Sequence, residues 1–195
     1  MFQKKNNSAS FPMECETARL ILRVLTPEAL RPVADFQWRN RELFEKYEPT
    51  LPENFYTASH QQAILKCEFQ LALKMETIRY YVFLKDDPTQ IIGTVCLHDI
   101  RRCSYSHCEI GYKFDMEYQH AGYAIEAVAC AVSIAFENLN LHRIFARVMP
   151  ENTSSIRLLE ALNFHNEGLE RGCIQIQGRW QDHIRYAILN PNLDL

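Results

Sequence analysis

One continuous stretch, residues 109–126, constrains the fold of this chain more than any other. It begins with apolar and aromatic residues, passes through a small-residue turn around Gly122, and leads directly into the helical apolar pattern of Ile125, Val128 and Val132. The predicted order is therefore strand, turn and helix. A glycine in such a turn lets a ligand approach the backbone, and the first turn of a helix leaves its N–H groups without helical partners.

A phosphate group would suit this turn, because a helix N-terminus combines partial positive charge with free N–H groups. The turn is not the Gly-x-Gly-x-x-Gly fingerprint of dinucleotide-binding folds, and it lacks the Gly-Lys-Ser/Thr end of a Walker loop. An ordinary strand-to-helix turn that happens to contain one glycine explains it equally well. The turn alone therefore leaves both interpretations open.

The residues of the turn and several motifs elsewhere in the chain together favour the phosphate interpretation. Residues 119–124, Gln-His-Ala-Gly-Tyr-Ala, resemble the Gln/Arg-x-x-Gly-x-Gly/Ala signature of the GCN5-related N-acetyltransferase (GNAT) superfamily, whose members hold the acetyl-CoA pyrophosphate with this loop. Further matches follow at residues 152–155 and 178–182. With Glu-Thr-Ala-Arg-Leu-Ile-Leu-Arg at residues 16–23, the chain is similar to the RimJ/RimL type, which acetylates ribosomal-protein N-termini. The resemblance covers roughly residues 16–190.

The resemblance implies a set of residues that contact acetyl-CoA, the expected co-substrate. The strand before the loop would bind the pantetheine arm through its backbone and polarise the thioester carbonyl, and the loop would bind the pyrophosphate. The expected contacts are Tyr112, Lys113, Phe114, Gln119, His120, Ala121, Gly122, Tyr123, Ala124 and Asn152. Asn152 has an equally good structural explanation as the N-cap of the helix that follows it.

The implied reaction is direct attack of a neutral amine on the thioester, with CoA thiolate as the leaving group. Glu109 is the expected base, because relatives present an acidic residue of this strand to the amine, directly or through water. A solvated strand carboxylate is the alternative. Ser155 is expected near the thiolate, either as an acid or only as a hydrogen-bond donor. Many relatives have a tyrosine where this chain has Leu159, so a tyrosine acid is not expected there.

The acceptor amine is less constrained than the cofactor. Likeness to the RimJ/RimL type implies a protein N-terminal α-amine, which costs about 1.2 kcal/mol to deprotonate at pH 7, against roughly 4.6 kcal/mol for a lysine side chain. Acetylation of a small amine such as a polyamine, amino sugar or antibiotic, and a catalytically silent CoA-binding module, remain alternatives. Aromatic side chains near the expected acceptor site could line a pocket, but aromatics dominate cores, so we expect packing roles for Trp38, Tyr47, Phe55 and Tyr56.

Periodicity along the chain predicts an α+β fold in one GNAT-like domain, with a mixed, mostly antiparallel sheet flanked by helices. A chain of 195 residues, 47% of them hydrophobic, is long enough to bury one such core. We expect this domain over residues 16–190, between a mobile tail of residues 1–15 and a C-terminal tail of residues 191–195. Helices are predicted as two short segments over 30–47, one over 59–75, one from the Gly122 turn to about residue 138, and one that starts at Asn152. Strands are predicted at 20–24, 80–84, 91–97, 106–114, 143–148, 171–177 and 183–189.

Charge, hydropathy and cysteine content bear on binding partners and on the cellular compartment. A formal net charge of −3 provides no basic field for direct nucleic-acid binding, and no apolar run is long enough to cross a membrane. An odd number of cysteines, seven, without an apolar run in residues 1–12 favours free thiols in a reducing cytoplasm. The sequence does not indicate an oligomeric state.

One Cys/His cluster invites a zinc site but lacks the paired Cys-x2-Cys spacing of zinc ribbons. We expect packing thiols and surface histidines rather than a metal at Cys96, His98, Cys103, His107 and Cys108.

Overall fold

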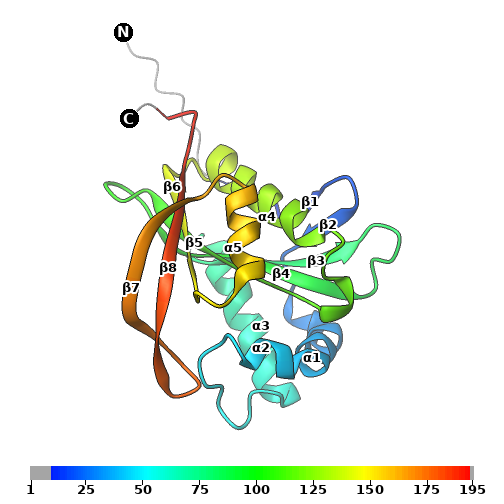
Figure 1. Cartoon of the computed structure of the whole chain (residues 1–195). Coiled ribbons are helices and arrows are strands. Elements are labelled where there is room, and N and C mark those ends of the chain that lie inside the picture. Colours follow the sequence, from blue (N-terminus) through cyan, green and yellow to red (C-terminus); the bar gives the residue numbers. More distant parts are fainter. Residues whose placement is uncertain (1–9, 194–195) are drawn as a thin grey trace.

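The computed structural model describes residues 10–193 of the chain. Its strands form one sheet in the order β1-β2-β3-β4-β5-β6-β8-β7, with helices on both faces (Figure 1). All neighbouring strands are antiparallel except β5 and β6, which are parallel. The predicted α+β class and the mixed, mostly antiparallel sheet are confirmed.

The elements follow the predicted order along the chain. The strands are β1 (Glu14–Glu16), β2 (Leu20–Arg23), β3 (Ile78–Leu84), β4 (Ile91–Arg101), β5 (His107–Phe114), β6 (Arg143–Val148), β7 (His165–Ile176) and β8 (Arg179–Leu189). The helices are α1 (Leu30–Arg39), α2 (Arg41–Glu45), α3 (Ala58–Leu73), α4 (Tyr123–Ser133) and α5 (Thr153–Ala161), with 3-10 turns at Pro27–Ala29 and Met116–Tyr118 and a π-helical end of α4 at Ile134–Asn138.

The bounds of the predicted elements differ from the structure most at the closing hairpin, at the N-terminal side of the domain and in β4, which ends at residue 101 rather than 97. The closing hairpin is longer than predicted, because β7 and β8 stay paired through two register shifts. Strand β1 lies before the predicted start of the domain and pairs with β2, so residues 14 and 15 belong to the sheet rather than to a tail. The rest of that predicted tail, residues 1–9, and residues 194–195 lie outside the described part of the chain. Within residues 10–193, no helix is long and apolar enough to cross a membrane.

The central strands bury apolar side chains on both faces. In β3, Tyr80 and Val82 belong to the core under α4 and α5, whereas Tyr81 and Phe83 belong to the core under α1 to α3. Successive side chains of a strand point to opposite faces, so a slip of one residue would exchange the two sets. The packing of both helical layers therefore fixes the register of this strand.

The parallel pair of β5 and β6 is short and determines where a site forms. Its last residue pair is Glu109 with Phe145. Beyond that pair, β5 continues beside β4 as far as Phe114, and β6 continues beside β8 as far as Val148. The two strands therefore separate in the middle of the sheet and leave a gap between them.

Candidate active site

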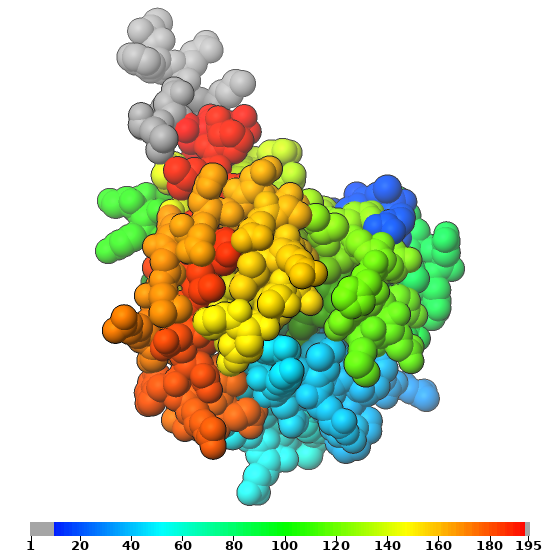
Figure 2. Space-filling view, viewed as in Figure 1, coloured from blue at the N-terminus to red at the C-terminus, as the bar shows by residue number. Residues whose placement is uncertain are grey.

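A cavity of about 410 Å³ lies at this gap, between α4 and α5 on one side and the α2–α3 connection on the other. Figure 2 shows the surface hollowed where the yellow α5 segment, the green segment before α4 and the blue-to-cyan α1–α2 region meet. A second cavity of about 140 Å³ is lined by residues 110–112 of β5 and 146–149 at the end of β6. Both are lined by Tyr47, Tyr112, Asn152 and Ser155, so the two cavities adjoin.

The larger cavity brings together most residues that the sequence predicted around acetyl-CoA. Those that line it are Tyr112, Lys113, Phe114, Gln119, His120, Gly122, Tyr123, Ala124, Asn152 and Ser155. Two predicted residues, Ala121 and Glu109, line neither cavity. The wall also contains residues that were not predicted: Leu43, Phe44, Tyr47, Glu48, Tyr118, Ile125, Ser154 and Leu158.

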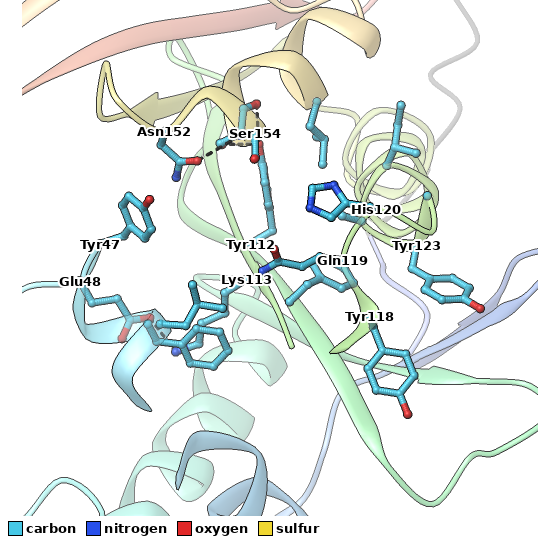
Figure 3. A pocket seen from close by; sticks show the side chains of 18 residues that line it. Tyr47, Glu48, Tyr112, Lys113, Tyr118, Gln119, His120, Tyr123, Asn152 and Ser154 are labelled. Atoms are coloured by element: carbon cyan, nitrogen blue, oxygen red, sulfur yellow. Dashed lines mark hydrogen bonds and ion pairs between the residues drawn. The ribbon is translucent and has the colours of Figure 1, made fainter. Parts of the chain in front are cut away.

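The loop before α4 has a backbone suited to an anion. Gly122 is the N-cap of α4 with φ of 80°, and His120 also has a positive φ, 62°. The Glu126 N–H donates to the Gly122 carbonyl at 3.2 Å, which begins the hydrogen bonding of the helix. The N–H groups of the first helical turn before it are therefore left for a ligand. Figure 3 shows the Gln119 and His120 side chains beside the cavity.

Arg19 and Thr17, in the turn between β1 and β2, hold this loop through Glu126 of α4. The Arg19 N–H and Nε donate to the Glu126 carboxylate at 2.8 and 2.7 Å, and the Thr17 hydroxyl donates to it at 2.6 Å. Arg19 Nη1 also donates to the Ala121 carbonyl at 2.9 Å, and the guanidinium lies 4.6 Å from the Tyr123 ring centre. Burial would raise the pKa of Glu126, but these hydrogen bonds outweigh it and lower the pKa.

Tyr112 and Ser155 form a hydroxyl pair where the two cavities adjoin. The Tyr112 hydroxyl lies 2.7 Å from Ser155 Oγ and 3.3 Å from the Ser155 carbonyl oxygen. Burial raises the pKa of Tyr112, and the bond to Ser155 only partly opposes it, so the phenol stays protonated at neutral pH. Asn152 Oδ1 accepts the Ser155 N–H at 3.2 Å, which makes Asn152 the N-cap of α5. Its contact with CoA stays a prediction.

Glu109 lies at the last residue pair before the strands separate, and it belongs to a chain of ion pairs. Its carboxylate accepts from Arg147 Nη1 at 2.6 Å, and only 14% of its side chain is exposed. Arg147 Nε donates to Glu170 at 2.6 Å, and Glu170 accepts from Arg185 at 3.0 Å. Burial raises the pKa of Glu109, and Arg147 opposes the rise. Arg147 lines the smaller cavity, so the Glu109 carboxylate stands behind the cavity wall.

The Lys113 side chain connects β5 to the α1–α2 region. Its Nζ donates to Glu48 at 2.6 Å and to Gln37 at 3.1 Å, and it lies 4.4 Å from the Phe44 ring centre. Burial lowers the pKa of Lys113, and Glu48 opposes this. Figure 3 shows Lys113 and Glu48 side by side at the cavity wall. The lysine side chain therefore fixes the wall of the cavity.

Aromatic residues near the acceptor side take different positions. Tyr47 lines both cavities, so it is not confined to the packing role that we expected. Trp38 is 56% exposed and contacts Tyr56 edge-on with ring centres 5.6 Å apart, and Phe55 contacts Tyr56 at 5.0 Å. These three residues pack against one another outside the two cavities.

The Cys/His cluster of the sequence lies on the paired strands β4 and β5 and in the connection between them. Cys96 and Cys108 are buried, whereas Cys103 is exposed. In the described part of the chain, no group of three or more His, Cys, Asp or Glu residues is arranged to hold a metal ion.

Residues 19–165 match the acetyltransferase (GNAT) domain family, and the chain belongs to this family. The protein is an acetyl-CoA-dependent N-acetyltransferase, as its motifs predicted. The probable N-acetyltransferase YjcK of Bacillus subtilis (strain 168) is 40% identical over 157 residues, which cover 80% of this chain and 86% of YjcK.

Two further relatives carry the name of ribosomal-protein acetyltransferases. The [ribosomal protein uS5]-alanine N-acetyltransferase of Escherichia coli (strain K12) is 30% identical over 178 residues, 90% of each chain. The crystal structure of the ribosomal-protein-S5-alanine acetyltransferase of Vibrio fischeri superposes with a TM-score of 0.87 at 29% identity, covering 94% of this chain and 100% of that one. The predicted likeness to the RimJ/RimL type is confirmed.

Proposed function

We propose that this enzyme acetylates the N-terminal α-amine of a protein, of the ribosomal-protein type. The observation that carries the proposal is the pair of adjoining cavities at the gap between β5 and β6. The larger one has room beside the predicted pyrophosphate loop, and the smaller one is lined by residues of β5 and β6, Arg147 among them, and by His183. Acetyl-CoA would occupy the larger cavity and the amine would enter the smaller one. The name of the E. coli relative supports a protein acceptor.

Acetyl-CoA would contact the cavity along three segments. The N–H groups before α4, in residues 119–124, would bind the pyrophosphate, because a helix N-terminus favours an anion. The pantetheine arm would follow residues 112–114 of β5, whose edge has no strand beside it beyond Glu109. Asn152, at the start of α5, would close the other wall.

In the chemical step, the amine nitrogen forms a bond to the thioester carbon, the carbon–sulfur bond breaks, and sulfur leaves with the electron pair. The proton of the attacking amine goes to Glu109 through water, because the Glu109 carboxylate stands behind the wall of the smaller cavity. Burial makes this carboxylate a stronger base than an exposed one, while Arg147 keeps it from becoming neutral too easily. An α-amine suits such a base, because roughly one-seventh of it is already neutral at pH 7.

The leaving thiolate would accept a hydrogen bond from Ser155, with Tyr112 behind it. When the Tyr112 hydroxyl donates to Ser155 Oγ, the serine hydrogen is free to point at the sulfur. Because the Tyr112 phenol stays protonated, its hydroxyl can donate this hydrogen bond to Ser155 Oγ throughout the reaction. Leu159 is fully buried in the core, so α5 supplies no phenol at that position and β5 supplies one instead.

Calorimetric titration with acetyl-CoA, followed by a thiol-release assay, tests the proposal. The acceptors are peptides that begin with alanine or serine, the same peptides with a blocked N-terminus and an internal lysine, and a panel of polyamines, amino sugars and aminoglycosides. We expect acetyl-CoA binding and turnover of the free N-terminal peptides only.

The alternatives predict other results in the same assay. Robust turnover of one small amine with none of the peptides would overturn the N-terminal acceptor and leave the enzyme class intact. Tight acetyl-CoA binding without transfer to any amine, the protein's own included, would support a silent binding module.

A further inference from the structure

Two cysteines that play no part in the proposed reaction lie in direct sulfur contact. Cys15 is in β1 and Cys130 is in α4, 115 residues apart in sequence, and their Sγ atoms are 2.7 Å apart. Non-bonded carbon atoms pack at roughly 3.5–4.0 Å, so these sulfur atoms are already closer than ordinary packing. The backbones of β1 and α4 therefore place the two side chains within reach of a covalent bond.

We propose that Cys15 and Cys130 are a modification site, at which a hydroperoxide converts the two thiols into a reversible disulfide. Among the described residues, no other two thiols are in such contact. Cys96 and Cys108 are buried in the sheet, Cys67 and Cys103 are exposed, and the nearest partners of Cys173 are His183 and Gln181. The site is thus defined by a pair, not by a single reactive thiol.

The local environment favours Cys15 as the thiol that reacts first. The hydrogen bond from Cys130 lowers the pKa of Cys15, although burial and the nearby Glu14 oppose it. Both cysteines are partly exposed, so a small oxidant has access to them.

The reaction balances with the hydroperoxide as oxidant. The Cys15 sulfur attacks the peroxide, the O–O bond breaks, and a sulfenic acid and an alcohol form, the alcohol being water when the oxidant is hydrogen peroxide. The Cys130 sulfur then attacks the Cys15 sulfur, the S–O bond breaks, and water leaves with the Cys130 proton. Two thiols are oxidised and one peroxide is reduced.

The disulfide would fasten the first strand of the sheet to the helix that follows the cofactor loop. Glu126, held by Thr17 and Arg19, lies one helical turn before Cys130 on the same helix. The covalent link would therefore reinforce a junction that polar contacts already make. Neither cysteine lines either of the two described cavities. Because the link closes a long loop, it restricts the unfolded chain and raises the thermal stability.

The test uses the full chain with Cys67→Ser and Cys103→Ser, which removes the exposed thiols that could join two molecules. The protein is treated with one equivalent of hydrogen peroxide, alkylated, and digested for mass spectrometry without reduction. We expect a linked peptide that contains Cys15 and Cys130, two fewer free thiols, and a rise in Tm of about 4–16 °C. Dithiothreitol should reverse all three changes.

Single variants decide whether this pair is the site. In the same background, Cys15→Ser and Cys130→Ser should each abolish the linked peptide and the Tm rise, whereas Cys173→Ser should retain both. Because either variant serves, a folding defect in one leaves the other as the test. The proposal is overturned if the folded parent protein keeps both thiols open to alkylation after oxidation. A disulfide from Cys15 to any other cysteine overturns it equally.

Discussion

At the scale of single residues, the proposed reaction depends on how Arg147 orients the carboxylate of Glu109. Arg147 binds Glu109 and Glu170 at the same distance, 2.6 Å, so a guanidinium orients the proposed base. Burial raises the pKa of Glu109 and Arg147 opposes the rise. Their balance leaves a carboxylate that is only weakly solvated and whose pKa is above its ordinary value, which suits a base for an amine whose pKa lies near neutrality.

Glu109→Gln keeps the shape of the side chain and removes its basicity. We expect kcat/KM to fall about tenfold near pH 6.5 and to approach the parent value above about pH 8.5, where solvent deprotonates the α-amine. The measurement is a pH profile with a peptide acceptor, alongside acetyl-CoA binding, which should not change. Glu170→Gln removes the other partner of Arg147 and is the matched control, with a profile parallel to the parent. A parallel profile for Glu109→Gln would make Glu109 a positioning residue.

Tyr112→Phe removes only the hydroxyl that contacts Ser155. We expect kcat to fall about fivefold to tenfold with unchanged acetyl-CoA affinity, because the lost bond matters when charge develops on sulfur. Ser155→Ala should cost more, and the double variant should be no slower than Ser155→Ala alone, since the phenol acts through the serine. Tyr118→Phe, another cavity tyrosine, serves as the control. Additive losses in the double variant would refute the coupling.

At the scale of elements, the loop before α4 is held in place by the β1–β2 turn. Gly122 has a positive φ, and a Cβ at this position would lie 3.3 Å from Arg19 Nη2. A side chain there would meet both an unfavourable backbone conformation and the arginine. The loop therefore requires a glycine in its own sequence and an arginine from an element about 100 residues away.

Arg19→Ala should weaken acetyl-CoA binding although Arg19 does not line the cavity. Loss of the bonds to Glu126 and the Ala121 carbonyl frees the loop, which must then be ordered by the ligand. We expect a Kd about fivefold to thirtyfold higher by calorimetry. Arg23→Ala, on β2 and paired with Glu14, is the matched control and should bind as the parent does. Equal affinities of the two variants would show that the loop needs no such support.

At the scale of the whole molecule, local patterns predicted the order of the elements and the class of the sheet. Hydrophobic periodicity and turn residues are signals between positions close together in the sequence, and the order and type of the elements depend on such local signals. The contacts that complete the site are not local: Glu109 meets Arg147 and Tyr112 meets Ser155 only because β5 and β6 are neighbours. Tyr47 was misjudged for a related reason, since composition does not distinguish an aromatic that packs in a loop from one that lines a cavity.

Asp115, directly after β5, makes a second connection to the α1–α2 region beside that of Lys113. Asp115 accepts hydrogen bonds from Arg39 Nε at 2.5 Å, from Asn40 Nδ2 at 3.1 Å and from the Glu117 N–H at 3.1 Å. Burial would raise the pKa of Asp115, but these bonds outweigh it and lower the pKa. The carboxylate therefore stabilises the fold above its unfolded pKa of about 3.9, and this stabilisation is lost as the pH falls through the folded pKa.

Asp115→Asn should lower the free energy of unfolding by about 1–3 kcal/mol at pH 7 and by less near pH 3.5, because that pH is below the unfolded pKa of about 3.9 and the carboxyl group is already partly protonated in the unfolded chain. Urea unfolding at the two pH values measures both differences. Asp35→Asn, on the exposed side of α1, should change little at either pH. If Asp115→Asn lowers the free energy of unfolding by the same amount at both pH values, the shape of the side chain rather than its charge stabilises this connection.

The early separation of β5 from β6 has a consequence for isotope exchange. Beyond Glu109, β5 is bonded to β4 on one side only, so its outward-facing amide hydrogens should exchange rapidly with deuterium in the free enzyme. If the pantetheine arm occupies the gap as proposed, acetyl-CoA should slow exchange in residues 110–114. Residues 107–109, already paired with β6, should show no change. Slower exchange confined to residues 110–114 would show that the bound cofactor pairs with the free edge of β5 as a neighbouring strand would. No change there would mean that the pantetheine arm binds elsewhere.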